Sequence, residues 1–136
     1  DSLIREGVEL AAEAVGLTDA LGLWGATGAT SIRLDAAEGR TGRAEDGTPT
    51  HEVILEIAGE HAEHGPGRYR WELIDPEGNV MLGARGVVLA IERLLGLDGS
   101  APPDPGLYFP EQLLDGQSVL DRLRTVGVRL SGPLPA

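Results

Sequence analysis

The hydrophobic period of this chain changes from two residues to about 3.6 across one short turn, and this change limits the fold more than any other feature. Before the turn, Tyr69, Trp71 and Leu73 alternate with charged residues, as in a half-buried β-strand. The turn, residues 75–79, carries Pro at its second position and Gly where a positive φ is needed. After it, apolar residues recur at helical spacing and end at Gly96: Val87, Val88, Ile91, Leu94 and Leu95.

Two further segments show the alternation of a strand. Residues 51–59 place Val53, Leu55 and Ile57 on one face, and the short segment 31–34 alternates in the same way. We expect these two strands to pair as a hairpin with a long loop. Residues 80–82 are expected to return as a strand beside residues 69–73. In the resulting ladder, Arg70 is expected to face Glu52 or Glu56.

The N-terminal part reads as a helix followed by a loop. Ile4, Val8, Ala11 and Val15 recur at helical spacing, which predicts a helix over residues 2–15 that ends at Gly16. The glycines in residues 17–29 predict a loop or close approaches between backbone segments.

Prolines divide the C-terminal part. Residues 98–110 contain four prolines and two glycines, and they are expected to form an extended connector. Pro110 is placed at the first position of a short helical turn. Ser118 resembles the first residue of a capping box for a last helix that Gly127 closes. The tail, residues 131–136, is expected to be loose.

These elements predict a single α+β domain over residues 1–136, with an antiparallel sheet of about four strands and helices packed on one face. A chain of 136 residues is long enough for one core but too short for a cofactor domain plus a substrate domain.

Composition excludes several partners and sites. Eleven Lys and Arg against 22 Asp and Glu give a net charge of −11, which repels nucleic-acid phosphates and anionic membrane surfaces. The sequence has no cysteine, so disulfides and thiolate metal sites are excluded. No apolar run is long enough for a membrane span, and the first residues do not resemble a signal peptide. We therefore expect a cytoplasmic protein that binds neither nucleic acid nor membrane.

Two motifs suggest ligand sites, and each has a simpler explanation. Residues 25–30, Gly-Ala-Thr-Gly-Ala-Thr, resemble a dinucleotide-binding glycine turn, but a strand pattern follows where the phosphate-binding helix should begin. His61 and His64, with Glu60 and Glu63 beside them and His51 upstream, offer metal ligands. They lie among glycines and Pro66, which favours a solvated hairpin loop. We assign no catalytic, cofactor-binding or metal-binding residue.

Three residues are candidates for substrate binding. Arg85 follows Gly83-Ala84 at a strand-to-helix junction, where a cation and main-chain donors can meet a carboxylate; an exposed arginine is the competing interpretation. Arg70 and Tyr108 complete the set. Tyr108 and Phe109 lie in the proline-rich connector and can alternatively pack on a partner surface.

Residues 51–128 resemble the C-terminal part of saccharopine dehydrogenase-like oxidoreductases. The similarity rests on the order of two strands, the segment from Gly86 to Gly96, the sequence Pro-Gly-Leu-Tyr-Phe-Pro-Glu at 105–111, and Val-Leu-Asp-Arg-Leu at 119–123 before Gly127-Val128. One departure is Ala84-Arg85-Gly86-Val87 at the start of the long helix, where the family often has Ser-Thr-Ala or Thr-Ala. A substrate contact made by that threonine therefore does not carry over.

The resemblance implies an NAD(P)-dependent enzyme whose N-terminal Rossmann domain is not in these 136 residues. This segment would then bind no cofactor itself, would shape the substrate site, and would contribute to a homodimer interface. Two alternatives have no catalysis. One is a stand-alone interaction module that uses its sheet edge or the Tyr108-Phe109 connector, and the other is a small-molecule-binding domain.

Overall fold

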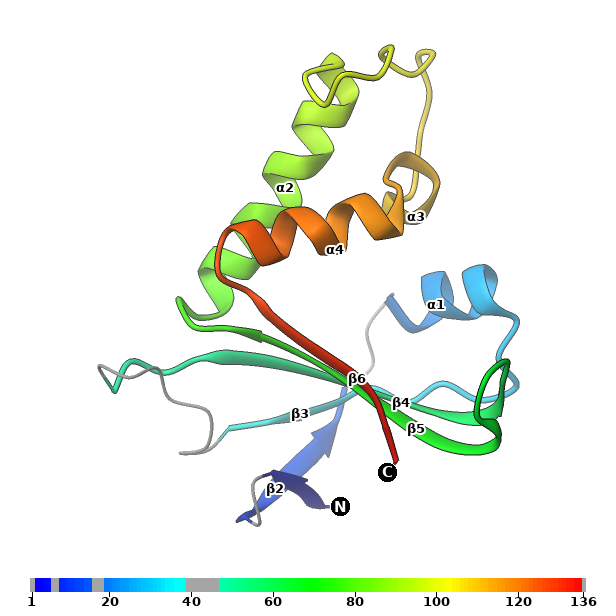
Figure 1. Ribbon diagram of the computed structural model, residues 1–136, viewed down its shortest axis with the longest axis vertical. Coiled ribbons are helices and arrows are strands. Elements are labelled where there is room, and N and C mark those ends of the chain that lie inside the picture. The colour runs from blue at the N-terminus through cyan, green and yellow to red at the C-terminus, as the bar shows by residue number, and fades with distance from the viewer. Residues whose placement is uncertain (1, 6–7, 16–18, 39–46, 136) are drawn as a thin grey trace. The chain divides into compact units, whose positions relative to one another are not determined.

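The computed structural model describes residues 2–5, 8–15, 19–38 and 47–135 (Figure 1). The chain divides into two compact units, Asp1–Thr41 and Gly42–Ala136. The predicted α+β class is confirmed, because helices accompany antiparallel strands. The strands belong to two three-stranded sheets, where the sequence suggested one sheet of about four strands.

The first unit begins with strands where a helix was predicted. β1 (Ser2–Arg5) pairs antiparallel with β2 (Val8–Ala14), so the expected helix over residues 2–15 was wrong. Gly7 lies in the middle of that segment, and a glycine inside a helix costs about 1 kcal/mol relative to alanine. In β2 the apolar residues also alternate, so tertiary pairing selected the strand from an ambiguous pattern.

A helix replaces the predicted loop of residues 17–29. α1 spans Asp19–Thr27, and Gly28 follows it with φ 64°, donating its N–H to the carbonyl of Trp24 at 2.8 Å. Gly22 and Gly25 have open space where a Cβ would be, so they serve no close backbone approach. The glycines therefore did not break the helix, because its other residues include alanine and leucine, which favour it.

The third strand of this sheet starts four residues later than predicted. Residues 31–34 are irregular, and β3 spans Asp35–Ala37. β3 pairs antiparallel with β2, with Ala12 opposite Ala37. The expected hairpin between residues 31–34 and 51–59 was therefore wrong.

The second unit contains the longer sheet, in the order β4-β5-β6. β4 (His51–His61) and β5 (Gly65–Asp75) confirm the two strands expected there and extend both. β6 (Arg129–Pro135) pairs antiparallel with the other side of β5. The expected return strand at residues 80–82 was wrong, because β6 pairs with β5 in its place. The expected loose tail was also wrong, because residues 131–135 belong to β6.

The turn after β5 leads directly into the longest helix. Gly78 has φ 88° and donates its N–H to the carbonyl of Asp75 at 3.3 Å, which confirms the predicted turn. α2 spans Asn79–Leu95, so it starts six residues before Arg85. Gly96 ends it in the left-handed region, as predicted.

Two shorter helices follow the connector. α3 (Pro110–Leu113) has Pro110 at its first position, as predicted. α4 (Gly116–Thr125) is capped by Asp115, whose carboxylate accepts the Ser118 N–H at 2.8 Å, so Ser118 as the cap residue was wrong. Gly127 has φ 89° just after α4, where the chain turns into β6. Figure 1 shows α4 beside α2, with β6 running from the end of α4 back into the sheet.

The longer sheet has one apolar and one charged face. Val53 lies opposite Leu73 and Leu55 opposite Trp71, and the alternation of strands puts all four side chains on one face. On the other face Glu56 lies opposite Arg70, whose Nη1 is 3.5 Å from the glutamate Oε1, as the sequence predicted.

The interior of the described residues is small. Leu123, Val128 and Asp75 are the described residues that are buried. Val53, Leu55 and Ile57 are 45%, 48% and 46% exposed, although they belong to the apolar face of the sheet. This face therefore offers apolar surface that another element can cover.

Among the described helices, none combines the length and the apolar character that crossing a membrane requires.

Two glycine substitutions test this structure. A Cβ on Gly132, whose φ is 126°, would lie 2.6 Å from Trp71 Cδ1 and 2.8 Å from the carbonyl oxygen of Arg70. Gly132→Ala is therefore expected to lower the free energy of unfolding by more than about 1 kcal/mol.

Gly83→Ala, in α2 with open space at its Cβ, is expected to raise the free energy of unfolding by roughly 0.5–1 kcal/mol. Urea denaturation followed by fluorescence measures both; a loss for Gly83→Ala would contradict the early start of α2.

The cap of α4 predicts a dependence on pH. The backbone N–H of Ser118, with its side chain adding a second contribution, holds the pKa of Asp115 below its ordinary value of 3.8. A carboxyl whose pKa is lowered by folding stabilises the fold above its unfolded pKa, and this stabilisation is lost as pH falls through the lowered value. The difference in melting temperature between wild type and Asp115→Ala should therefore be constant near neutral pH and shrink in strong acid. A difference that grows on acidification would contradict the cap.

Candidate functional site

The carboxylate of Asp75 lies at the junction of sheet and helix and has no exposed surface. It ends β5, and its Oδ1 accepts the backbone N–H of Glu77 at 3.0 Å. Its Oδ2 accepts Nε of Arg85 at 2.9 Å, and Nη2 of the same guanidinium lies 3.4 Å from Oδ1. The carboxylate therefore orders the turn and also joins α2 to the sheet.

The guanidinium of Arg85 has a second carboxylate partner. Its Nη2 lies 3.2 Å from Oε1 of Glu77, and the Arg85 side chain is 13% exposed. Two carboxylates thus face one guanidinium, which leaves a local excess of negative charge. Arg85 therefore stabilises the fold through both ion pairs. A substrate carboxylate would have to compete with Asp75 and Glu77 for its guanidinium.

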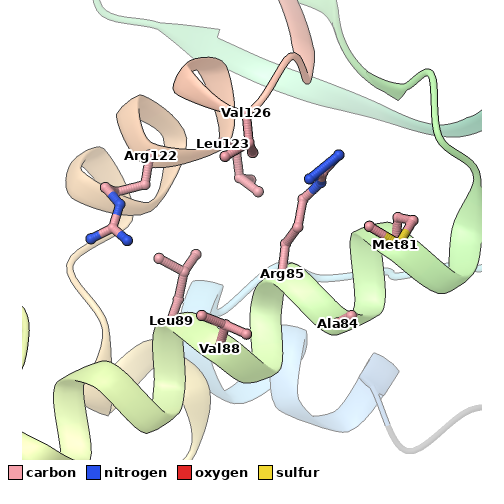
Figure 2. Close-up of a pocket in the computed structure, with 8 residues that line it drawn as sticks. All are labelled: Met81, Ala84, Arg85, Val88, Leu89, Arg122, Leu123 and Val126. Atoms are coloured by element: carbon pink, nitrogen blue, oxygen red, sulfur yellow. The ribbon is translucent and has the colours of Figure 1, made fainter.

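A cavity of about 190 Å³ lies between α2 and α4, beside this ion pair. Figure 2 shows the Arg85 side chain rising from α2 into the space between the two helices, while Leu123 and Val126 approach from α4. Eight residues line the cavity: Met81, Ala84, Arg85, Val88, Leu89, Arg122, Leu123 and Val126.

The walls of this cavity are mainly aliphatic. A space of about this size accommodates a benzene-sized ring or a branched aliphatic group. Arg122, at one side, is paired with Glu92 at 2.7 Å, so its charge is also compensated. The cavity is therefore suited to an uncharged apolar group, with two paired guanidiniums at its border.

A second, polar hollow of about 380 Å³ lies between α2, the connector and α4. Its charged walls include two ion pairs, Arg122 with Glu92 at 2.7 Å and Arg93 with Asp98 at 3.9 Å. Arg93 also donates to the carbonyl of Ala101 at 2.7 Å. The two contacts of Arg93 hold the connector against the end of α2, and the pair of Arg122 with Glu92 joins α4 to α2.

The structure does not gather the three predicted substrate-binding residues into one cavity. Only Arg85 lines the cavity between α2 and α4. Arg70 lies on the charged face of β5, where its Nε is 2.9 Å from Glu72 Oε1. Since Asp75 belongs to the other face, Arg70 and the Arg85 ion pair lie on opposite sides of the sheet.

Tyr108 is bound within its own connector. Its hydroxyl donates to the carbonyl of Asp104 at 2.6 Å, and its ring lies over Gly106, where a Cβ would be 3.2 Å from the ring. The tyrosine therefore shapes the loop. Its neighbours Leu107 and Phe109 are 96% and 60% exposed, so two large apolar side chains of the connector face outward.

The two histidines form an aromatic cluster at the tip of the β4-β5 hairpin. The rings of His61 and His64 stack with centroids 4.6 Å apart, and Tyr69 lies 5.1 Å from His61. Nδ1 of His61 accepts the N–H of Glu63 at 3.1 Å. The described residues contain no group of three or more His, Cys, Asp or Glu that could hold a metal ion.

The glycine run at residues 25–30 lies at the wrong end of a helix for binding phosphate. Gly25 is in the last turns of α1, and Gly28 follows its C-terminus. Carbonyl groups and the negative end of the dipole face outward at a helix C-terminus, whereas phosphate sites use the N–H groups of an N-terminus.

Comparison with protein-family models, with curated proteins and with solved structures found no match to this chain.

Sequence reasoning missed the partner of Arg85. Asp75 was interpreted as a turn residue, and α2 was expected to begin at Arg85, so the two residues seemed unrelated. The available signal was the helical spacing of Met81, Arg85 and Val88, which places one arginine within an apolar stripe. An arginine at such a position needs a buried acid.

The ion pair predicts a specific pattern of stabilities. Asp75→Asn leaves a mostly buried guanidinium with only the exposed carboxylate of Glu77 as a charged partner, and it should lower the free energy of unfolding by roughly 3 kcal/mol. Adding Arg85→Met should recover part of this loss, because the unpaired charge is removed. Urea denaturation in a Trp24→Phe background makes Trp71 the fluorescent probe.

Glu77→Gln is the matched control, since the Glu77 side chain is 55% exposed. It should cost less than about 1 kcal/mol. Strictly additive effects of Asp75→Asn and Arg85→Met would contradict the coupling of these two residues.

Proposed function

We propose that this chain is the C-terminal, non-nucleotide-binding domain of a saccharopine dehydrogenase-like NAD(P)-dependent oxidoreductase. In this proposal it contributes to the substrate site and to a homodimer interface, while a preceding Rossmann domain binds NAD(P). The enzyme would be cytoplasmic and would bind neither nucleic acid nor membrane.

The observation that carries the proposal is the helix pair held beside the sheet. Strands β4 and β5, helix α2, the proline-rich connector and helix α4 follow one another in the order of the family's motifs. The connector returns the chain so that α4 lies beside α2, with an apolar cavity between them. Such a cavity is suited to binding part of a substrate next to a cofactor domain.

In this proposal Arg85 positions the cavity wall and does not itself bind the substrate. Its ion pair with Asp75 fixes the start of α2 and therefore the position of the cavity wall. In the proposed enzyme, Arg85 acts as a positioning residue, and the apolar side chains of Val88, Leu89 and Leu123 contact the substrate.

The test compares the 136-residue chain with the native polypeptide that contains it. An antibody against residues 51–128 should capture a longer polypeptide from native cells, and this polypeptide should bind NADPH in a fluorescence titration. The 136-residue chain should not bind NADPH at micromolar concentration. Micromolar binding by the chain itself would refute the assignment of its role.

A second candidate, a stand-alone interaction module, is favoured by the exposure of Leu107 and Phe109 in the connector. Capture of a native polypeptide of the same size as this chain, without dehydrogenase activity, would support it. Replacement of both residues by serine should then abolish partner binding.

A further inference from the structure

The strand β4 lies at an edge of its sheet. It pairs with β5 from His51↔Asp75 to His61↔Gly65, and in the part of the chain that the structure describes no strand pairs with its other side. An edge strand of 11 residues presents a long row of main-chain donors and acceptors to a further strand.

A strand added at this edge must continue both faces of β4. Val53, Leu55 and Ile57 form the half-exposed apolar face, while Glu52, Glu56 and Glu60 lie on the opposite face. An antiparallel strand with the same alternation matches both faces. The β4 strand of a second copy has this alternation.

We propose that two copies of this chain pair through β4, antiparallel and about a two-fold axis, with Leu55 opposite Leu55 of the second copy. The inference rests on the proposed function for the expectation of a homodimer, and it identifies the surface and the register. The pairing would join two three-stranded sheets into one of six strands and would make the two apolar faces continuous.

The alternation of the two faces limits the possible registers. Residues directly opposite each other in an antiparallel pair project to the same side of the sheet. A slip that sets Leu55 opposite Glu56 would place the apolar face of one copy beside the charged face of the other. Symmetric registers therefore have one residue opposite itself.

The glutamates then select among these registers. Pairing centred on Glu56 puts Glu56 opposite itself and Glu52 opposite Glu60, and pairing centred on Ile54 puts Glu52 opposite Glu56. Like charges directly opposite each other destabilise a pair of strands. Both registers are disfavoured.

Pairing centred on Leu55 avoids every such contact. It places Glu52 opposite Ala58 and Glu56 opposite Ile54, and it sets Val53 opposite Ile57 on the apolar face. Pairing centred on Ile57 also separates the glutamates, but it puts Leu55 opposite Gly59. The register centred on Leu55 therefore combines apolar pairing on one face with no like-charge pair on the other.

Charges within each copy also permit the two β4 edges to approach each other. The carboxylate of Glu56, the central acid of the edge, lies 3.5 Å from Arg70 and 4.0 Å from Arg68 on the neighbouring strand. The net charge of −11 on each copy still opposes association at long range. The dimer should therefore tighten when salt screens this repulsion.

Cysteine scanning tests the register, because the chain has no cysteine of its own. Residues directly opposite in an antiparallel pair have Cα atoms about 4.5–5.5 Å apart, within the range of a disulfide. After mild oxidation of the dilute full chain, Leu55→Cys should give a covalent dimer, whereas Glu56→Cys and Ile57→Cys should not. Leu73→Cys, on the central strand of the same face, is the control and should form no covalent dimer.

Faster cross-linking of Glu56→Cys or Ile57→Cys than of Leu55→Cys would overturn the register. Cross-linking of Leu73→Cys alone would show that sheet faces stack instead of edges pairing, and it would overturn the proposal. The absence of a covalent dimer for every variant would also overturn it.

A charge variant tests the pairing without cysteines. Ala58 is exposed and lies opposite Arg68 within the chain, so Ala58→Glu leaves the fold intact. In the dimer the new carboxylate faces Glu52 of the second copy at two symmetric positions, and dissociation should increase roughly fivefold. Sedimentation at two salt concentrations measures this, with Ala58→Gln as the matched uncharged control. Equal dissociation constants for the two variants would refute the proposed contact.

These outcomes are separable from those of the proposed function. A monomeric chain whose native polypeptide binds NADPH would refute the β4 interface and leave the oxidoreductase assignment standing. A β4 dimer formed by a native polypeptide of only this length would support the β4 interface and refute the oxidoreductase assignment.

Discussion

The buried ion pair between Asp75 and Arg85 determines how helix and sheet meet in the second unit. A carboxylate without exposed surface is costly to desolvate, and it is accommodated here by the guanidinium and by the backbone N–H of Glu77. Because Asp75 ends β5 and Arg85 lies on α2, one contact fixes both the turn and the direction of the helix. The wall of the cavity between α2 and α4 depends on it.

The same contact changes the interpretation of the charged residues. An arginine at the start of a helix suggests anion binding when it is considered alone, but Arg85 is already paired with two carboxylates. Arg70 is likewise held by Glu56 and Glu72. What the second unit offers to other molecules is apolar surface: the cavity between the helices and the exposed face around Leu55.

Predictions from the sequence succeeded where local signals agreed. Both long strands, the turn at Gly78 and the helix end at Gly96 were expected, since alternation, turn residues and a C-terminal glycine each have a local physical cause. They failed for residues 2–15, whose apolar spacing fits helix and strand alike. The resemblance to an oxidoreductase family remains a prediction.

The sequence by itself determined the α+β class, the alternating faces of β4 and β5, and the apolar stripe of α2, because these follow from periodicity. Only the tertiary structure decided which strand lies beside β5. β6 takes the place on its second side, which no local signal at residues 129–135 indicated. Tertiary contacts also decided that Arg85 binds Asp75, since this pairing depends on where the turn directs the helix and not on the spacing of the two residues.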